Sequence, residues 1–201
     1  MTSYTYELKI PKDRVAVLIG KGGETKKEIE DNTHCRLDID SGEGDVIITG
    51  EDGLGLFSAK EVVKAIARGF NPEVAILLLG PNYSFEMINI PDYVGKSKDK
   101  MLRLKGRVIG TEGKTRRIIE EHTSTHITIY GKTICIIGTI EDVLIAKKAI
   151  ESLLEGAPHS SVYTWLEKKR RSRVLERLEP IEFKEGIKEE LKKDIKRWRT
   201  T

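Results

Sequence analysis

Two short glycine motifs contain the residues whose type and spacing suggest a binding function. Gly20-Lys21-Gly22-Gly23 occurs early in the chain, and Gly110-Thr111-Glu112-Gly113 follows ninety residues later. Glycine at both ends lets the backbone turn sharply and lets another backbone come close. The helix expected after each motif would offer its N-terminal N–H groups to an anion. The pattern therefore predicts a contact with phosphate, although a tight turn between two helices would also require glycine.

No catalytic or metal-binding pattern accompanies these motifs. The first resembles a nucleotide-binding loop but lacks its Gly-Lys-Ser/Thr ending. His122 and His126 are four residues apart, but the residues between them favour a change from helix to strand, and a third ligand is not evident. Cys35 and Cys135 form neither a disulfide framework nor a metal knuckle, so we expect buried free thiols. We expect no enzyme activity, no metal and no cofactor.

The surrounding sequence repeats along with the motifs, which predicts two copies of one domain. An offset of ninety residues holds from Leu18 to Ile39 and then falls to 88 and 87. Alternating and helical patterns predict strands at 4–10, 36–40 and 45–49 and helices at 13–19, 24–32 and 54–68. The second copy repeats this order with strands at 85–90, 126–130 and 133–137 and helices at 114–122 and 140–154. It also carries ten extra, lysine-rich residues within 92–105.

The remaining segments join and extend the two copies. Residues 71–79 read as an apolar linking helix that begins at Asn71 and Pro72, and we expect it to pack between the copies. After residue 157 the chain becomes highly charged, with helices expected at 162–176 and 184–199. The predicted divisions are a first domain at 1–70, a linker at 71–83, a second domain at 84–157 and a charged helical extension at 158–201.

The charge distribution favours a nucleic-acid partner more than the total charge does. The 201 residues include 35 Lys and Arg and 32 Asp and Glu, for a net charge of +3. Residues 96–117, however, hold nine basic and two acidic residues, and 165–201 hold thirteen and eight. Such clusters are typical of nucleic-acid contacts, with a solvated face as the alternative. No apolar run is long enough to span a membrane and no signal sequence is evident, so we expect a cytoplasmic protein without a membrane contact.

The order β-α-GxxG-α-β-β-α, with Ile-Gly-x-x-Gly followed two residues later by Thr, resembles the type I KH domain. The resemblance implies an α+β fold of two tandem KH domains, each a three-stranded antiparallel sheet with its helices on one face. KH domains bind single-stranded RNA or DNA, and the GxxG loop clamps about four nucleotides of the backbone. One GxxG motif would be weak support, whereas two within the same order of elements are strong support.

The second half resembles, more narrowly, the archaeal and eukaryotic two-KH ribosome-biogenesis family called Partner of Nob or Dim-two. The similar stretches are 104–110, 113–116, 141–150 and 156–163. The family implies assembly of the small ribosomal subunit, contact with the 3′ end of its rRNA and a partnership with the Nob endonuclease. For archaeal members it also implies the α subunit of initiation factor two. Eukaryotic members have lost the first glycine loop, which this chain keeps as Gly20–Gly23.

We expect RNA to contact both loops and the basic residues around them. The residues expected at the first loop are Ile19, Gly20, Lys21, Gly22, Gly23, Lys26, Lys27 and Arg36. Those expected at the second loop are Lys105, Arg107, Ile109, Gly110, Thr111, Glu112, Gly113, Lys114, Arg116, Arg117 and His126. For single apolar residues the core is the alternative, and for Lys27, Arg36 and His126 it is a solvated surface.

The two loops differ in charge, and this leaves two functions open. Glu112 is unfavourable beside a phosphate, but Lys98, Lys100, Arg103, Lys105 and Arg107 surround it with basic charge. We therefore expect the second copy to make the main rRNA contact by a narrow margin. The alternative function is a protein-interaction scaffold, in which one KH unit and the charged tail bind a nuclease or the initiation-factor subunit.

Overall fold

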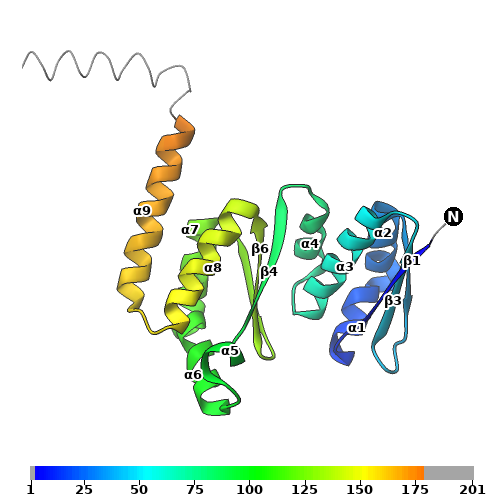
Figure 1. Cartoon of the computed structure of the whole chain (residues 1–201), viewed down its shortest axis with the longest axis horizontal. Coiled ribbons are helices and arrows are strands. Elements are labelled where there is room, and N and C mark those ends of the chain that lie inside the picture. The colour runs from blue at the N-terminus through cyan, green and yellow to red at the C-terminus, as the bar shows by residue number, and fades with distance from the viewer. Residues whose placement is uncertain (1–2, 179–201) are drawn as a thin grey trace, which may run out of the picture.

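The computed structural model describes residues 3–178 as two units of helices and strands, followed by one long helix (Figure 1). The first unit has the predicted order β-α-α-β-β-α. Its elements are β1 (Tyr4–Lys9), α1 (Lys12–Ile19), the 3-10 turn η1 (Lys21–Gly23), α2 (Glu24–Thr33), β2 (Cys35–Ile39), β3 (Asp45–Gly50) and α3 (Gly53–Ala67). The strands form an antiparallel sheet in the order β1-β3-β2.

The second unit repeats this order with a longer first helix. Its elements are β4 (Tyr83–Asn89), α5 (Pro91–Val94), α6 (Lys98–Ile109), the 3-10 turn η3 (Thr111–Gly113), α7 (Lys114–Thr123), β5 (His126–Tyr130), β6 (Thr133–Thr139) and α8 (Ile140–Leu154). The sheet order is β4-β6-β5. The ten extra residues form α5 and the first part of α6, which begins where the Ser97 side chain accepts a hydrogen bond from the Lys100 N–H. The insertion therefore extends the helix that leads into the second glycine loop.

The linker packs between the two units, as predicted. It is a four-residue helix, α4 (Pro72–Ala75), followed by a 3-10 turn, η2 (Ile76–Leu79), and not the single helix expected. Leu78 shares one hydrophobic cluster with the first-unit core and with Cys135 and Ile137 of the second sheet. Helices α3 and α4 lie against the face of this sheet opposite α7 and α8 (Figure 1).

The central strands of the two sheets differ in burial. In β3, buried and exposed residues alternate, whereas in β6 every residue from Thr133 to Gly138 is buried. The second sheet is therefore covered on both faces by helices. Phe70 and Phe85 meet edge to face across the boundary with ring centroids 6.4 Å apart, and the Tyr130 hydroxyl donates to Oδ2 of Asp13 at 2.8 Å. These contacts join the units into one body.

The first helix of the charged extension packs on the second unit. Helix α9 (His159–Leu178) contacts α7 and α8 and buries Val162 and Leu166. The Lys148 ammonium lies 5.7 Å from the centre of the Trp165 ring, and Arg173 pairs with the buried carboxylate of Asp142. The helix expected at 162–176 is confirmed, and the one expected at 184–199 lies outside the described residues. None of the helices within 3–178 combines the length and the apolar content needed to cross a bilayer.

Both cysteines are buried free thiols, as expected. Cys35 lies in the first unit, and burial raises the pKa of its thiol. Cys135 lies at the boundary between the units, where burial raises its thiol pKa to about 11. Because thiolate is the reactive form, neither thiol is suited to nucleophilic chemistry.

Candidate nucleic-acid interface

The first glycine loop requires glycine for two different reasons. Gly20 has a φ of 76°, and a Cβ there would lie 2.3 Å from the Thr25 hydroxyl oxygen. Gly22 and Gly23 also have left-handed φ angles, of 64° and 84°, but a Cβ on either would meet no atom within 4 Å. Gly20 is therefore needed for packing against the buried Thr25, while Gly22 and Gly23 leave open backbone that a phosphate can approach.

The second loop has the same backbone with one different residue. A Cβ on Gly110 would lie 2.2 Å from the Thr115 hydroxyl oxygen, and the space around Gly113 is open. Glu112 takes the place of Gly22 and has a φ of 51°, which is uncommon for a residue with a side chain. The Arg117 guanidinium donates to the Glu112 carbonyl at 2.9 Å. The loop shape is thus retained despite the loss of a glycine.

A carboxylate fixes the helix after each loop to the strand across the groove. Oε1 of Glu30 accepts a hydrogen bond from the Leu37 N–H at 2.7 Å, and Oε1 of Glu120 accepts one from the Ile127 N–H at 2.8 Å. Both strands are at the edge of their sheets, so each bond ties the helix after a loop to an edge strand. The sequence analysis gave these glutamates no role, although their occurrence at equivalent places in both copies was a usable signal.

The predicted cations of the first loop are partly paired with carboxylates. Lys21 and Lys27 are exposed beside the open glycines. Nζ of Lys26 lies 3.9 Å from Glu30, and Arg36 at the edge strand pairs with Asp38 at 3.4 Å. Ile19 is half-buried and packs on the core. Lys21 and Lys27 are therefore the two predicted first-unit cations that form no ion pair within the described residues.

The second loop has a larger set of nearby cations. Lys114 is exposed directly after the loop, and Arg117 is exposed while it holds the Glu112 carbonyl. Nε of Arg116 lies 3.5 Å from Glu120, so Arg116 repeats the place of Lys26. Of the other predicted residues, Lys105 is half-buried on α6 and Ile109 is exposed directly before the loop, whereas His126 is exposed at the start of β5, beyond the far end of α7.

The Arg107 guanidinium also has a role within the fold. Its Nε donates to the Leu153 carbonyl at 3.0 Å and its Nη2 to the Ala157 carbonyl at 2.7 Å, so the guanidinium closes the end of α8. Arg14 of the first unit makes the same pair of bonds to Ile66 and Phe70 at the end of α3. Both arginines thus hold the end of a helix in place, and Arg107 also lines the cavity beside the second loop.

Helix α9 adds a wall beside the second loop that the sequence analysis did not predict. The Tyr163 hydroxyl lies 2.8 Å from the Thr115 hydroxyl, and Nε2 of His159 lies 2.9 Å from the Arg107 carbonyl. A cavity of about 430 Å³ lies between α6, the loop and α9. It is lined by Arg103, Gly106, Arg107, Gly110, Thr111, Lys114, Thr115, His159 and Tyr163. We call it the loop cavity.

The two histidines considered as a metal pair are on different elements. His122 is on α7 near α9, and His126 begins β5 at the surface. Helix α7 ends at Thr123, so the spacing of four is not a helical one. Within the described part of the chain, His, Cys, Asp and Glu side chains form no group of three that could hold a metal ion.

Comparisons with known proteins agree with this geometry. Residues 84–171 match a family model described as a eukaryotic type KH-domain (KH-domain type I), specific for the second such domain of PNO1 proteins, and 5–65 match the general KH domain. The chain is 47% identical to a KH domain-containing protein of Methanocaldococcus jannaschii over 90% of this chain and 81% of that one.

One solved relative is a complex of a/eIF2alpha, aDim2p and rRNA from Pyrococcus horikoshii. The similarity is 46% identity with a TM-score of 0.78, and it covers 85% of this chain and 96% of that one. A pre-rRNA-processing protein, pno1, of Aspergillus fumigatus is 34% identical over 61% of this chain and 49% of its own length. The chain thus spans about half the length of this eukaryotic relative.

Proposed function

Since the chain belongs to the Dim2/PNO1 family of KH-domain proteins, we propose that it clamps single-stranded RNA through both glycine loops during small-subunit rRNA processing. The observation that carries the proposal is the duplicated loop. In each unit an open glycine backbone precedes a helix N-terminus and lies beside exposed cations. A type I KH loop of this kind contacts about four nucleotides.

The proposed RNA is the 3′ end of the small-subunit rRNA. The support is the Pyrococcus relative, which is named in complex with rRNA, and the fungal relative, which is named for pre-rRNA processing. Because the two units form one body, two clamps would hold about eight nucleotides of a single strand. We propose the second unit as the main contact, since more cations surround its loop, and the first as an additional contact.

Loop variants test the proposal and rank the units. One variant carries Lys21→Asp with Gly22→Asp, and the other carries Thr111→Asp with Glu112→Asp. Aspartate tolerates the left-handed backbone better than most residues, so the fold should survive while the added charge repels phosphate. Lys12→Asp is the control, because Lys12 begins α1 at the end opposite the loop.

The measurement is fluorescence anisotropy with a labelled RNA of the small-subunit 3′ end, repeated over a range of salt. We expect each loop variant to weaken binding and to reduce the slope of log K against log salt by about 0.7 for every lost phosphate contact. The first-loop variant changes the charge by three units and the second-loop variant by one, so we expect the second-loop variant to lose more affinity for each unit of charge. If neither variant binds more weakly than Lys12→Asp, the clamp proposal is wrong.

A protein partner is a second, compatible proposal. The Pyrococcus relative is named in a complex that also contains a/eIF2alpha, and the acidic Glu112 in the second loop would be suited to a basic protein surface. We propose the initiation-factor α subunit, and from the family resemblance the Nob endonuclease, as candidates. Capture of either purified protein before and after ribonuclease treatment separates a direct contact from one bridged by RNA.

A further inference from the structure

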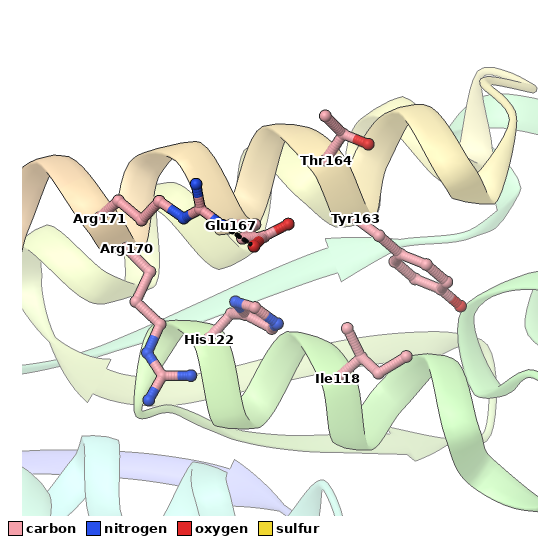
Figure 2. Close-up of a pocket in the computed structure, with 7 residues that line it drawn as sticks. All are labelled: Ile118, His122, Tyr163, Thr164, Glu167, Arg170 and Arg171. Atoms are coloured by element: carbon pink, nitrogen blue, oxygen red, sulfur yellow. Dashed lines mark hydrogen bonds and ion pairs between the residues drawn. The ribbon is translucent and has the colours of Figure 1, made fainter.

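A second cavity lies between α7 and α9 (Figure 2). Its volume is about 770 Å³, and we call it the α7–α9 groove. It is lined by Ile118, His122, Tyr163, Thr164, Glu167, Arg170 and Arg171. Figure 2 shows Ile118 and His122 pointing from α7 toward α9, with Tyr163 near one end of the groove and Arg170 near the other.

The groove exists because the two copies differ on one face of a helix. Ile118 and His122 of α7 occupy the positions of Glu28 and Asn32 in α2. In the first unit these polar residues are exposed, whereas Ile118 and His122 are half-buried beside α9. The apolar replacement gives α9 a surface on which to pack, so the groove is specific to the second unit.

The groove combines flat rings with a free positive charge. Arg171 is paired with Glu167 at 2.6 Å, so its charge is largely balanced. Arg170 is exposed and has no carboxylate partner among the described residues. The Tyr163 and His122 rings face the groove, and Nδ1 of His122 is buried without a hydrogen-bond partner within 3–178. A buried nitrogen of this kind is seldom left unpaired, so a polar group from water or a ligand is expected beside it.

The groove also continues from the glycine loop. Tyr163 lines both the α7–α9 groove and the loop cavity, and its hydroxyl is bonded to Thr115 just after the loop. The loop cavity adds Arg103 and Lys114, both exposed. Tyr163 therefore joins the loop cavity, with its two exposed cations, to the α7–α9 groove, which has Arg170 near its other end.

We propose that the α7–α9 groove extends the RNA path of the second unit and holds one or two nucleotides adjacent to those in the clamp. The proposal rests on the proposed function and adds a site that is joined to the second loop through Tyr163. A base would stack on Tyr163 or His122 and a phosphate would pair with Arg170, the combination by which single strands are usually bound.

RNA fits these residues better than an acidic peptide does. An acidic peptide would need several free cations, and Glu167 already occupies Arg171. A nucleotide needs one cation and one flat apolar surface, and the groove supplies both. Between residues 159 and 173 the chain has five basic residues and one acidic residue, which also favours a polyanion.

The test compares RNAs that fill the clamps with RNAs that extend beyond them. The core probe is an eight-nucleotide RNA of the small-subunit 3′ end, and two further probes carry four extra nucleotides on the 5′ or the 3′ side. With the full chain, we expect one of the extended RNAs to bind about ten-fold more tightly than the core, the gain expected from one stacked base. If neither extension increases affinity, the proposal is wrong.

Matched variants on α9 assign the gain to the groove. Arg170→Glu changes a residue of the groove, and Lys168→Glu makes the same change of charge at an exposed position that does not line it. We expect Arg170→Glu to abolish the gain from the extension while core binding changes by less than about two-fold. We expect Lys168→Glu to keep most of the gain. Equal losses in the two variants would show a diffuse charge effect and overturn the proposal.

Crosslinking of the unaltered protein gives a second readout. A 4-thiouridine within the favoured extension should crosslink to peptides of α7 or α9, whereas crosslinks confined to other elements contradict the proposal. Core binding that depends on the glycine loops without a gain from Arg170 leaves the proposed function intact and rejects only the groove. A polyglutamate peptide is the remaining probe. If the unaltered protein binds this peptide, Arg170→Glu does not, and both bind RNA equally, the groove is a site for a protein and not for RNA.

Discussion

The Tyr163 hydroxyl lies 2.8 Å from the hydroxyl of Thr115, so α9 is tied directly to the second residue after the glycine loop. The same Thr115 oxygen lies where a Cβ on Gly110 would be. One hydroxyl therefore contacts both the first glycine of the loop and the C-terminal extension. In the first unit, Thr25 makes the equivalent contact with Gly20. It has no counterpart of the contact with Tyr163, because the described part of α9 contacts α7 and α8 of the second unit.

Tyr163→Phe should destabilise the protein slightly. The substitution removes the hydroxyl and leaves the buried Thr115 oxygen without this partner, at a cost of about 1 kcal/mol. For a chain of this size we expect the melting temperature to fall by about 2–4 °C. Tyr4→Phe is the matched control, because Tyr4 is 51% exposed and should show almost no shift. Equal shifts in the two variants would contradict the role given to this hydrogen bond.

Replacement of Glu112 should separate backbone strain from charge. Glu112→Gln removes the charge and keeps a side chain on the left-handed backbone, so we expect tighter RNA binding and unchanged stability. Glu112→Gly restores the residue type of the first loop and relieves the strain, and we expect an additional gain in stability of about 0.5–1 kcal/mol. Anisotropy and thermal unfolding measure the two effects. Unchanged affinity in both variants would show that the carboxylate does not face the RNA.

Gly69→Ala should loosen the boundary between the units. Gly69 has a φ of 100°, and a Cβ there would lie 3.0 Å from the Thr128 hydroxyl oxygen across the boundary. Gly156→Ala is a matched control, since Gly156 is its counterpart with a φ of 106° and nothing within 4 Å. Both variants should lose stability through backbone strain, but only Gly69→Ala should also disturb the interface.

Alkylation of the two cysteines measures how far the boundary between the units is loosened in Gly69→Ala. Cys135 lies at the boundary and Cys35 within the first unit, and both are buried. At pH 8 iodoacetamide should label Cys135 faster in Gly69→Ala than in Gly156→Ala, with Cys35 labelled equally in the two, as measured by mass spectrometry. Equal labelling of Cys135 would mean that the boundary accommodates the added methyl group.

The sequence predicted the elements that depend on local pattern and on repetition. The order of strands and helices in each copy, the two glycine loops and the packing of the linker followed from alternation, turn residues and the internal offset. The extra residues before the second loop were located, but their helices were not, because their many lysines obscure the apolar spacing of Met101, Leu104 and Val108. Local pattern thus fixed the architecture better than the details.

Features that depend on distant partners were missed. The bonds of Arg107 to the end of α8 were not predicted, because the sequence does not show which carbonyls will lie within reach of its guanidinium. The covering of the second sheet on both faces was not predicted, although Ile134 to Ile137 in the middle of β6 form an unbroken apolar run. The packing of α9 through Val162 and Leu166 was not predicted, and the difference between Ile118 and His122 and their counterparts Glu28 and Asn32 in the first copy was its available sequence signal.

The contact between Tyr130 and Asp13 should make the boundary between the units sensitive to alkaline pH. The hydrogen bond to the carboxylate, with a smaller effect from burial, raises the pKa of the Tyr130 phenol. Folding therefore favours the neutral phenol. Its contribution to stability is fully present below the ordinary tyrosine pKa of about 10 and is lost as pH rises through the higher folded value.

The difference in melting temperature between the unaltered protein and Tyr130→Phe should therefore stay constant from about pH 7 to 9 and shrink toward pH 11. Asp13→Asn is the control, because its neutral amide can still accept from the phenol but no longer raises the phenol pKa by its charge. The same difference in melting temperature, measured between Asp13→Asn and Asp13→Asn with Tyr130→Phe, should begin to shrink at lower pH. A difference that does not change between pH 8 and 11 would show that the phenol does not need its proton to hold the two units together.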